Sequence, residues 1–193
     1  ISVRPEVSDA KLGLATKDIP WQTRRTNMVD VCSACHNSNF TDAFYQQYDG
    51  LIDLYHDKFA KPGLALYQAA KPLLNPAQFS NPIDFTWYEI WHHEGRRARH
   101  GVSMMGPDIT HWHGTYEVAK HFYSHYVPEL QELIEKSKNS SDAKKKEAAE
   151  KLEKLLDETL NNANHQWYLN KMSPEEKAQR DKERAEYKKR YAK

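Results

Sequence analysis

Two cysteines and a histidine form the most reactive group of residues in this chain. Cys32 and Cys35 are its only cysteines, two residues lie between them, and His36 follows directly. This Cys-x-x-Cys-His pattern is typical of c-type haem attachment. In such sites both thiols bond to the porphyrin, and the following imidazole binds the iron as the proximal ligand. We therefore expect one low-spin haem c on Cys32 and Cys35, with His36 and a second histidine on the iron.

Two other kinds of site use paired cysteines at this spacing. A thioredoxin-like redox pair belongs in a βαβ unit, and no such pattern surrounds these residues. A zinc site needs two more ligands, and no histidine or carboxylate stands at a recognisable spacing from the pair. Both alternatives stay open, but the pattern favours haem.

Haem is attached to such motifs on the outer side of a membrane, so we expect a periplasmic location or an equivalent lumen. The chain begins at Ile1 without a leader, which predicts a processed or excised product. No apolar run is long enough to span a bilayer. The net charge of +1 and the mean hydropathy of −0.91 favour neither a nucleic-acid nor a membrane partner.

Histidines are concentrated in the middle of the chain. Eight of the 10 fall within residues 92–165, at positions 92, 93, 100, 111, 113, 121, 125 and 165. One haem needs at most one distal histidine, so the surplus has three explanations. These side chains bind haems of another polypeptide, transfer protons in a redox reaction, or are ordinary core and surface residues.

Two further groups in this region have both a chemical and an ordinary interpretation. His121 and His125 are four residues apart, which suits a metal ion, although a pair at an interface is the simpler interpretation. Arg96, Arg97 and Arg99 suit haem propionates, because guanidinium binds carboxylate through two hydrogen bonds. A solvated basic surface explains the arginines equally well.

The composition predicts an almost all-α chain. Glycine is scarce, at 7 residues, and alternating β-branched runs are absent. We expect three regions: an extended lead-in over 1–31 without strong periodicity, a haem-binding and histidine-rich helical region over 32–127, and long charged helices over 128–193 that serve as an oligomerisation surface or tail. Any β-pairing is expected only within 1–31.

Local signals divide the helices further. Helical patterns over 41–59 and 64–74 flank Pro62-Gly63, which predicts an interruption or a kink. Two Asn-Pro pairs bracket a loop over 75–82. Gly106-Pro107-Asp108 ends the next helical block, with Asp108 as the expected N-cap of the following helix. Leucines at helical spacing predict buried stripes over 130–134 and 149–160, and a capping box at Ser173 starts the charged tail.

The string over 87–116 is the most specific part of the sequence. It contains Trp-His-His-Glu-Gly-Arg-Arg-Ala-Arg-His-Gly, Met-Met-Gly-Pro-Asp and His-Trp-His-Gly-x-Tyr. Together with the haem motif and the aromatic-rich helix after it, this string resembles the C-terminal part of the octahaem hydroxylamine oxidoreductase family. The resemblance covers about residues 27–138. It implies a multihaem cytochrome c fold, with long C-terminal helices that pack a homotrimer.

The resemblance also implies partners and ligands. Cys32, Cys35 and His36 would match the last of eight haem motifs, so a seven-haem part is expected on the same or a separate chain, with a redox partner cytochrome. One of four histidines would supply a distal ligand to a haem of that part: His93, His100, His111 or His113. His111 is our first choice, because it lies one turn after Pro107 and can point inward beside Trp112. The catalytic residues remain unknown.

One departure from the family bears on the direction of catalysis. Members that oxidise hydroxylamine or hydrazine have a tyrosine just after the Pro-Asp motif, bonded to the catalytic haem of a neighbouring subunit. Here Ile109, or with a small gap His111, stands at that position, and Tyr116 is the nearest tyrosine. The resemblance therefore implies the reductive branch, which converts nitrite to nitric oxide, hydroxylamine or ammonia. Hydroxylamine or hydrazine oxidation and a stand-alone monohaem electron carrier remain the alternatives.

Overall fold

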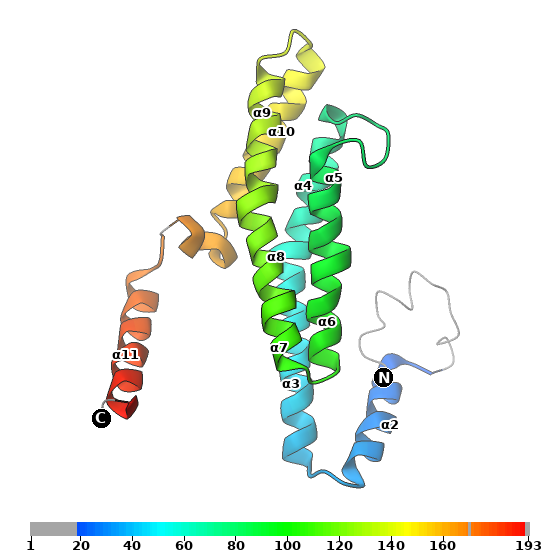
Figure 1. The fold of residues 1–193 in the computed structure, drawn as a ribbon, viewed down its shortest axis with the longest axis vertical. Helices are drawn as coiled ribbons and strands as arrows, with labels where there is room; N and C mark the ends of the chain where they lie inside the picture. The colour runs from blue at the N-terminus through cyan, green and yellow to red at the C-terminus, as the bar shows by residue number, and fades with distance from the viewer. Residues whose placement is uncertain (1–18, 170, 192–193) are drawn as a thin grey trace.

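The protein is almost entirely helical. A computed structural model describes residues 19–169 and 171–191, and no strand occurs among them, which confirms the all-α expectation. The remaining residues, including most of the expected lead-in over 1–31, lie outside the described part. Three long helical columns stand side by side, and a fourth helix packs against one end of them (Figure 1).

Each column joins α-helical pieces through π-helical turns. The first runs through α3 (Ser38–Tyr55), the π-helical turn η1 (His56–Ala60) and α4 (Lys61–Ala70), and it ends in the short 3₁₀ helix η2 (Lys71–Leu73). The second contains α5 (Pro82–Tyr88), η3 (Glu89–Glu94) and α6 (Gly95–Ser103). The third contains α7 (Pro107–Thr110), η4 (His111–Thr115), α8 (Tyr116–His121), η5 (Phe122–Tyr126) and α9 (Val127–Lys138).

The core is densest where α10 (Ala143–Leu160) packs against α4 and α9. Leu130, Leu152 and Leu156 are buried there, so the predicted stripes are confirmed. Asp142 caps α10, since its side chain accepts a hydrogen bond from the Lys144 amide at 2.9 Å. One hydrophobic cluster contains residues on both sides of residue 128. The expected regional boundary therefore falls inside the third column, where the helix continues.

Small residues let the columns approach closely. A Cβ on Gly63 would lie 2.5 Å from the Trp87 indole, and a Cβ on Gly114 would lie 2.6 Å from Ala98 Cα. Gly63 also supplies the carbonyl that accepts a hydrogen bond from the buried Tyr126 hydroxyl at 2.8 Å. Pro62-Gly63 therefore does not interrupt the first column. It lies in the first turn of α4, where proline is tolerated, and Gly63 lies at a crossing point.

The predicted breaks between columns occur, with one correction. The loop between the Asn-Pro pairs ends at Asn81, which forms a capping box with Asp84 at the start of α5. Gly106, not Asp108, is the N-cap of α7, so the expectation for Asp108 was wrong. Pro107 takes the first helical position because it has no N–H to satisfy there, and this moves Asp108 into the first turn.

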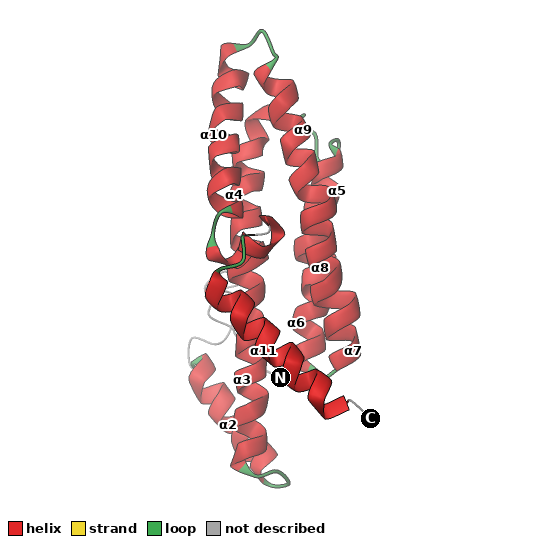
Figure 2. Ribbon diagram, turned by 90° about the vertical axis from the view of Figure 1, so that its left-hand side faces the viewer, coloured by secondary structure: helices red, strands yellow, loops and turns green. Residues whose placement is uncertain are grey.

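The expectation of an extended chain up to residue 31 was also wrong, because α2 spans Trp21–Ser33. Its partly buried positions are spaced three and four residues apart: Trp21, Arg24, Arg25, Met28, Val29 and Cys32. Two arginines in this stripe hide the amphipathic pattern from a reading based on apolar residues. Figure 2 shows α2 beside the lower part of α3.

The chain ends in two elements beyond α10. A 3₁₀ segment, η6 (Ala163–Leu169), returns to the columns and places His165 in the core. After it, α11 (Pro174–Tyr191) stands off the bundle (Figure 1), and its side chains over 174–190 are exposed. The predicted capping box is present, because the Ser173 hydroxyl accepts from the Glu176 amide while the Glu176 carboxylate accepts from the Ser173 amide, both at 3.1 Å.

Candidate functional site

The Cys-x-x-Cys-His motif forms one continuous turn at the end of α2. The amides of Cys35 and His36 both donate to the Cys32 carbonyl, at 3.1 and 2.9 Å. The two cysteines are thus three residues apart on a helical turn and lie on the same side of it. Asn37 then caps α3, because its side chain accepts a hydrogen bond from the Phe40 amide at 3.0 Å. The motif is therefore held between two helices.

The groups of this turn are accessible to a large ligand. Both thiols are free, Cys35 is exposed and Cys32 is partly exposed. The His36 ring is also exposed and stacks on Phe40, with 4.1 Å between ring centroids. Val31 and Phe40 leave apolar surface beside the motif, at 68% and 42% exposure. Two accessible thiols, an adjacent imidazole and uncovered apolar surface fit a covalently attached porphyrin.

Every π-helical turn in the described part of the chain contains a histidine. His56 lies in η1, His92 and His93 in η3, His111 and His113 in η4, and His125 in η5. A π-helical turn inserts one extra residue, and such turns are frequent at functional sites. Most histidines of the middle region therefore lie in π-helical turns, and no sequence motif indicates where these turns occur.

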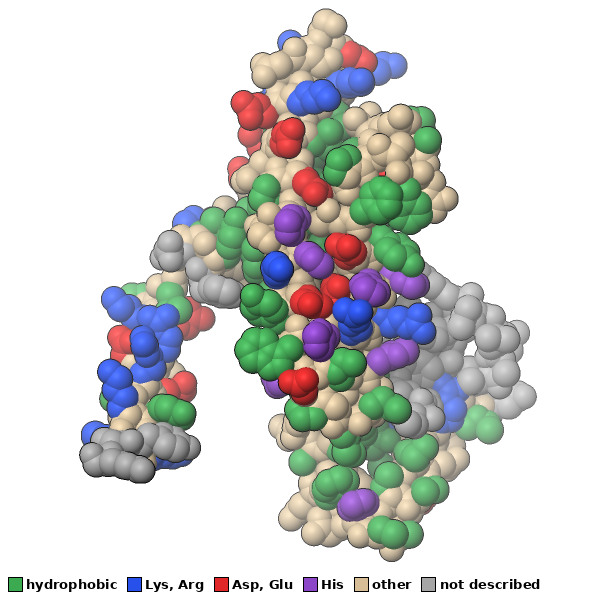
Figure 3. Space-filling view, in the orientation of Figure 1, with side chains coloured by type: hydrophobic (Ala, Val, Ile, Leu, Met, Phe, Trp, Pro, Cys, Tyr) green, Lys and Arg blue, Asp and Glu red, His purple; other side chains and the backbone are tan. Residues whose placement is uncertain are grey.

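Two of the four candidate distal ligands line one groove. His93 and His100 border a surface groove of about 350 Å³, together with His92, Arg96, Arg97, Gly101, Met104 and Ile109. The groove is mostly apolar where Met104 and Ile109 contribute, with imidazole and guanidinium groups around it. Histidine and arginine side chains gather on the face of the molecule drawn in Figure 3. We call this the histidine groove.

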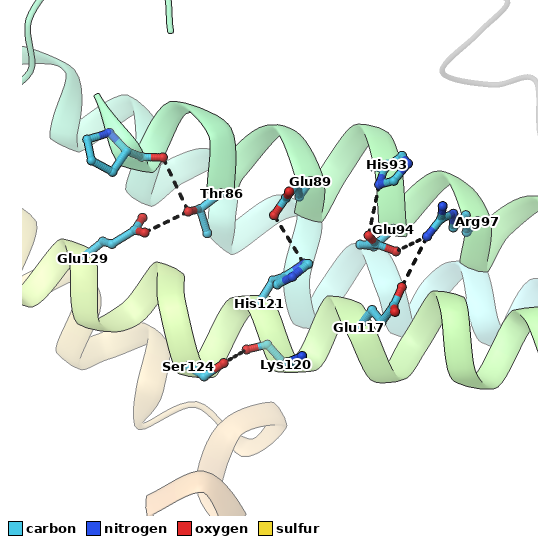
Figure 4. Close-up of polar contacts among 11 residues, drawn as sticks. Thr86, Glu89, His93, Glu94, Arg97, Glu117, Lys120, His121, Ser124 and Glu129 are labelled. Atoms are coloured by element: carbon cyan, nitrogen blue, oxygen red, sulfur yellow. Dashed lines mark hydrogen bonds and ion pairs between the residues drawn. The ribbon is translucent and has the colours of Figure 1, made fainter. Parts of the chain in front are cut away.

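A buried carboxylate connects the histidine groove to the third column. The side chain of Glu94 is 5% exposed, and its carboxylate lies 3.1 Å from His93 Nδ1 and 3.3 Å from Arg97 NH1. The same Arg97 nitrogen donates to Glu117 at 3.4 Å, and Glu117 lies 3.8 Å from His113 Nδ1. Figure 4 shows the contacts of Glu94 with His93 and Arg97, and of Arg97 with Glu117. His93 and His113 thus approach one cluster of charges from two columns.

The two carboxyl groups of this cluster have opposite pKa shifts. Burial raises the pKa of Glu94, and the neighbouring Glu117 raises it further. The pKa of Glu117 is lowered, chiefly by a hydrogen bond with Glu94 and also by His113 and Arg97. Glu94 is therefore the weaker acid of the two, and Glu117 is the stronger.

His111 lies apart from this cluster. It is exposed and borders a shallow depression with Trp112, Thr115 and Tyr116. The expectation that His111 points inward beside Trp112 was wrong, because the indole of Trp112 is itself 61% exposed. The π-helical turn η4 follows α7 directly, and Gly114, not a histidine, faces the second column. The His111 imidazole is thus exposed on the surface of this chain.

His121 and His125 are close, but no further metal ligand joins them. Their ring centroids are 5.7 Å apart, and His121 Nδ1 lies 3.7 Å from the Glu89 carboxylate. Burial lowers the pKa of His121, although Glu89 partly opposes this shift. Across the residues that the structure describes, no three His, Cys, Asp or Glu side chains converge to hold a metal ion. No described helix is both long and apolar enough to cross a membrane.

The three arginines after Glu94 differ in their contacts. Arg97 joins the carboxylate cluster, and Arg99 donates to the Gly95 and Trp91 carbonyls at 3.0 and 3.3 Å. Arg96 is exposed at the histidine groove, where an anionic group could approach it. A role in binding propionates therefore suits Arg96 best, and it stays a prediction.

Arg25 and Asp49 belong to no recognisable motif, and only the packing of α2 on α3 brings them together, two helical turns before Cys32.

Comparisons with protein-family models, with curated proteins and with solved structures found no match to this chain.

Proposed function

We propose that this chain carries one covalent haem c on Cys32 and Cys35, with His36 as proximal ligand and a second histidine opposite. The observation that carries the proposal is the single turn that presents both thiols and the imidazole beside uncovered apolar surface. When bound, the haem would supply one-electron transfer. The chain itself orients the thiols through α2 and holds His36 between the end of α2 and the cap of α3.

We further propose that the chain is the C-terminal haem-bearing part of a multihaem oxidoreductase that acts on nitrogen compounds. The resemblance of residues 27–138 to the octahaem hydroxylamine oxidoreductase family supports this assignment. Exposed histidines that face away from the chain, at the histidine groove and at His111, suit ligands to haems of a seven-haem neighbour. The assembly would be a periplasmic homotrimer that exchanges electrons with a cytochrome, with the C-terminal helices contributing to its packing.

Within that assembly we propose reduction of nitrite, to nitric oxide, hydroxylamine or ammonia. This reduction consumes electrons from a donor and protons, and it releases water. Ile109 and His111 stand where oxidative members would have their tyrosine, and neither side chain readily forms such a cross-link. His111 and His113 are exposed imidazoles, and imidazole is a common proton donor and acceptor in catalysis.

The first experiment measures the intact mass of the denatured chain from cells that attach haem c. We expect the chain mass plus one haem, and a low-spin spectrum of the native protein. Replacing both thiols (Cys32→Ser with Cys35→Ser) should abolish the added mass, whereas Ser33→Ala, inside the same turn, should retain it. A bare wild-type mass would contradict attachment, and a high-spin five-coordinate spectrum would contradict the second histidine.

The second experiment measures what co-purifies and what the assembly does. We expect about eight haems for each copy of this chain, nitrite consumption with a reduced artificial donor, and no peptide bonded to haem through Tyr116. A ratio of one haem per chain would favour a stand-alone electron carrier. Fast hydroxylamine or hydrazine oxidation with negligible nitrite reduction would instead establish the oxidative reaction.

The third experiment replaces each candidate distal ligand in turn by alanine. Loss of a ligand converts one haem of the assembly from low-spin to high-spin, which electron paramagnetic resonance detects. We expect this change for one of His93, His100, His111 and His113, and His125→Ala is the control at an exposed histidine outside the set. If all four variants leave every haem signal unchanged, no distal ligand comes from this group.

A further inference from the structure

The position of the attachment turn depends on how α2 packs against α3. α2 contains no fully buried residue, so burial of apolar side chains alone holds it weakly. Its partly buried stripe includes Arg25 and, two turns later, Cys32. Any group that fixes this stripe against α3 therefore also fixes the first thiol of the motif.

Arg25 makes the most directional contact between the two helices. Its NH1 and NH2 groups donate to the two carboxylate oxygens of Asp49 at 2.7 and 2.9 Å. The guanidinium carbon also lies 5.0 Å from the centre of the Trp21 ring and 4.5 Å from that of Tyr45. The Arg25 side chain is only 18% exposed. A two-point ion pair between aromatic rings fixes both the distance and the angle of the guanidinium plane.

Tyr45 is the α3 residue whose ring lies against the Arg25 guanidinium. It lies one helical turn before Asp49 on α3, and its hydroxyl is close enough to interact electrostatically with both Arg25 and Cys32. Burial is the main cause of the raised pKa of Tyr45, which is consistent with its position between the two helices. Arg25 thus contacts α3 through Asp49 and the Tyr45 ring, on the same stripe of α2 that carries Cys32 two turns later.

We propose that Arg25 is a positioning residue for the haem-attachment turn, holding α2 against α3 so that the two thiols and the His36 imidazole keep one relative geometry. The inference rests on the proposed function, because it concerns the haem expected on Cys32 and Cys35. Lysine cannot replace this arginine, since an ammonium group offers neither a planar face for the two rings nor two parallel hydrogen bonds to Asp49.

The test compares Arg25→Lys, Arg25→Met and Asp49→Asn in the haem-loaded protein. Each should retain the covalent haem, because attachment requires only the thiols. Each should shift the midpoint potential of this haem and broaden its low-spin resonance, because His36 then samples several orientations. Combining Arg25→Met with Asp49→Asn should shift the potential no further than the larger single change.

Arg24 provides the matched control. It is the neighbouring residue on α2, carries the same charge, and donates to the Ile19 carbonyl at 3.2 Å within its own segment. Arg24→Lys and Arg24→Met should therefore leave the potential and the resonance unchanged. A shift in Arg24→Met as large as that in Arg25→Met would reduce the effect to loss of a nearby charge and overturn the proposal.

The outcomes separate the inference from the function on which it depends. A wild-type chain without haem contradicts the proposed function and the inference with it. A wild-type chain with haem, together with an Arg25→Lys variant of unchanged potential and resonance, contradicts the positioning role alone. Circular dichroism of Arg25→Lys, the mildest change, verifies that the variant is folded. A shift in its potential or resonance then reports a change of geometry at the haem and not a loss of fold.

Discussion

Two neighbouring regions of this molecule differ in whether their large apolar side chains are buried or exposed. Residues 118–160 bury theirs, including Phe122, Tyr126 and Leu130, and expose none of the large ones. Residues 88–116 leave many of theirs exposed, namely Tyr88, Trp91, Met104, Met105, Ile109, Trp112 and Tyr116. The first region completes its core with α10. The second offers apolar, aromatic and imidazole groups to the outside.

This difference indicates which region buries its apolar surface within this chain and which region leaves apolar surface free for an interaction. Large exposed apolar patches in monomers mark sites of interaction. The exposed apolar side chains here lie in the same stretch of chain as the π-helical turns η3 and η4 and all four candidate distal ligands. Buried positions, which dominate region 118–160, should therefore determine stability, and the exposed apolar side chains of region 88–116 should determine binding. Four measurements can break or sharpen this division.

Leu156→Ala should have the largest effect. The side chain is 3% exposed within the core that α10 completes. Truncating a buried leucine removes apolar contacts and leaves a cavity, so the free energy of unfolding should fall by about 2–5 kcal/mol. Urea denaturation measures this change. An unchanged midpoint would mean that the stripe of α10 is exposed in solution.

Gly114→Ala should come next, because a Cβ there would meet the backbone of Ala98 at 2.6 Å. Forcing the second and third columns apart should lower the free energy of unfolding by about 1–3 kcal/mol. Gly50→Ala is the control, since nothing lies within 4 Å of its added methyl group and it lies inside α3. The free energy of unfolding of Gly50→Ala should rise by about 0.5–1 kcal/mol, because alanine is favoured over glycine inside a helix. A stable Gly114→Ala protein would show that the columns are not in close contact.

His165 should produce a smaller, pH-dependent effect. Burial lowers its pKa, the charge of Lys58 lowers it further, and Nδ1 lies 2.8 Å from the Tyr123 hydroxyl oxygen. The unfolded state, with a histidine pKa near about 6.5, binds the proton more readily. The stability from neutral His165 is thus present above that pH and lost as the pH falls below it.

The measurement for His165 is the free energy of unfolding at pH 7.5 and 5.5. We expect wild type to lose more stability on acidification than His165→Phe, which retains an aromatic ring against Phe122 but cannot be protonated. His125→Gln, at an exposed histidine, is the control and should follow wild type. Equal losses in wild type and His165→Phe would mean that His165 does not resist protonation.

Trp112→Ala should have the smallest effect on stability, despite removing the largest kind of side chain. The indole is 61% exposed, and surface substitutions usually change stability by less than about 0.5 kcal/mol. The same change should instead weaken association with the proposed multihaem partner, which analytical ultracentrifugation measures. A loss of stability comparable to that of Leu156→Ala would remove the distinction between the two regions.

Much of the fold could be predicted because its signals are local. The leucine stripe of α10, the loop between the Asn-Pro pairs and the capping box at Ser173 each depend on residues within a few positions of one another. By contrast, α2 was missed because arginines occupy its partly buried stripe. Arg25 is acceptable there only because Asp49 and two rings, far along the chain or a turn away, satisfy its charge.

The sequence by itself carries the proposal of covalent haem attachment, because Cys32, Cys35 and His36 lie within five residues and a single helical turn brings them together. Only the tertiary structure decides where the other histidines point. An α-helix advances by about 100° per residue, so each one-residue π-helical insertion rotates all later side chains around the axis. The meeting of His93 and His113 at the Glu94–Glu117 cluster and the outward position of His111 follow from those insertions and from the packing of the columns.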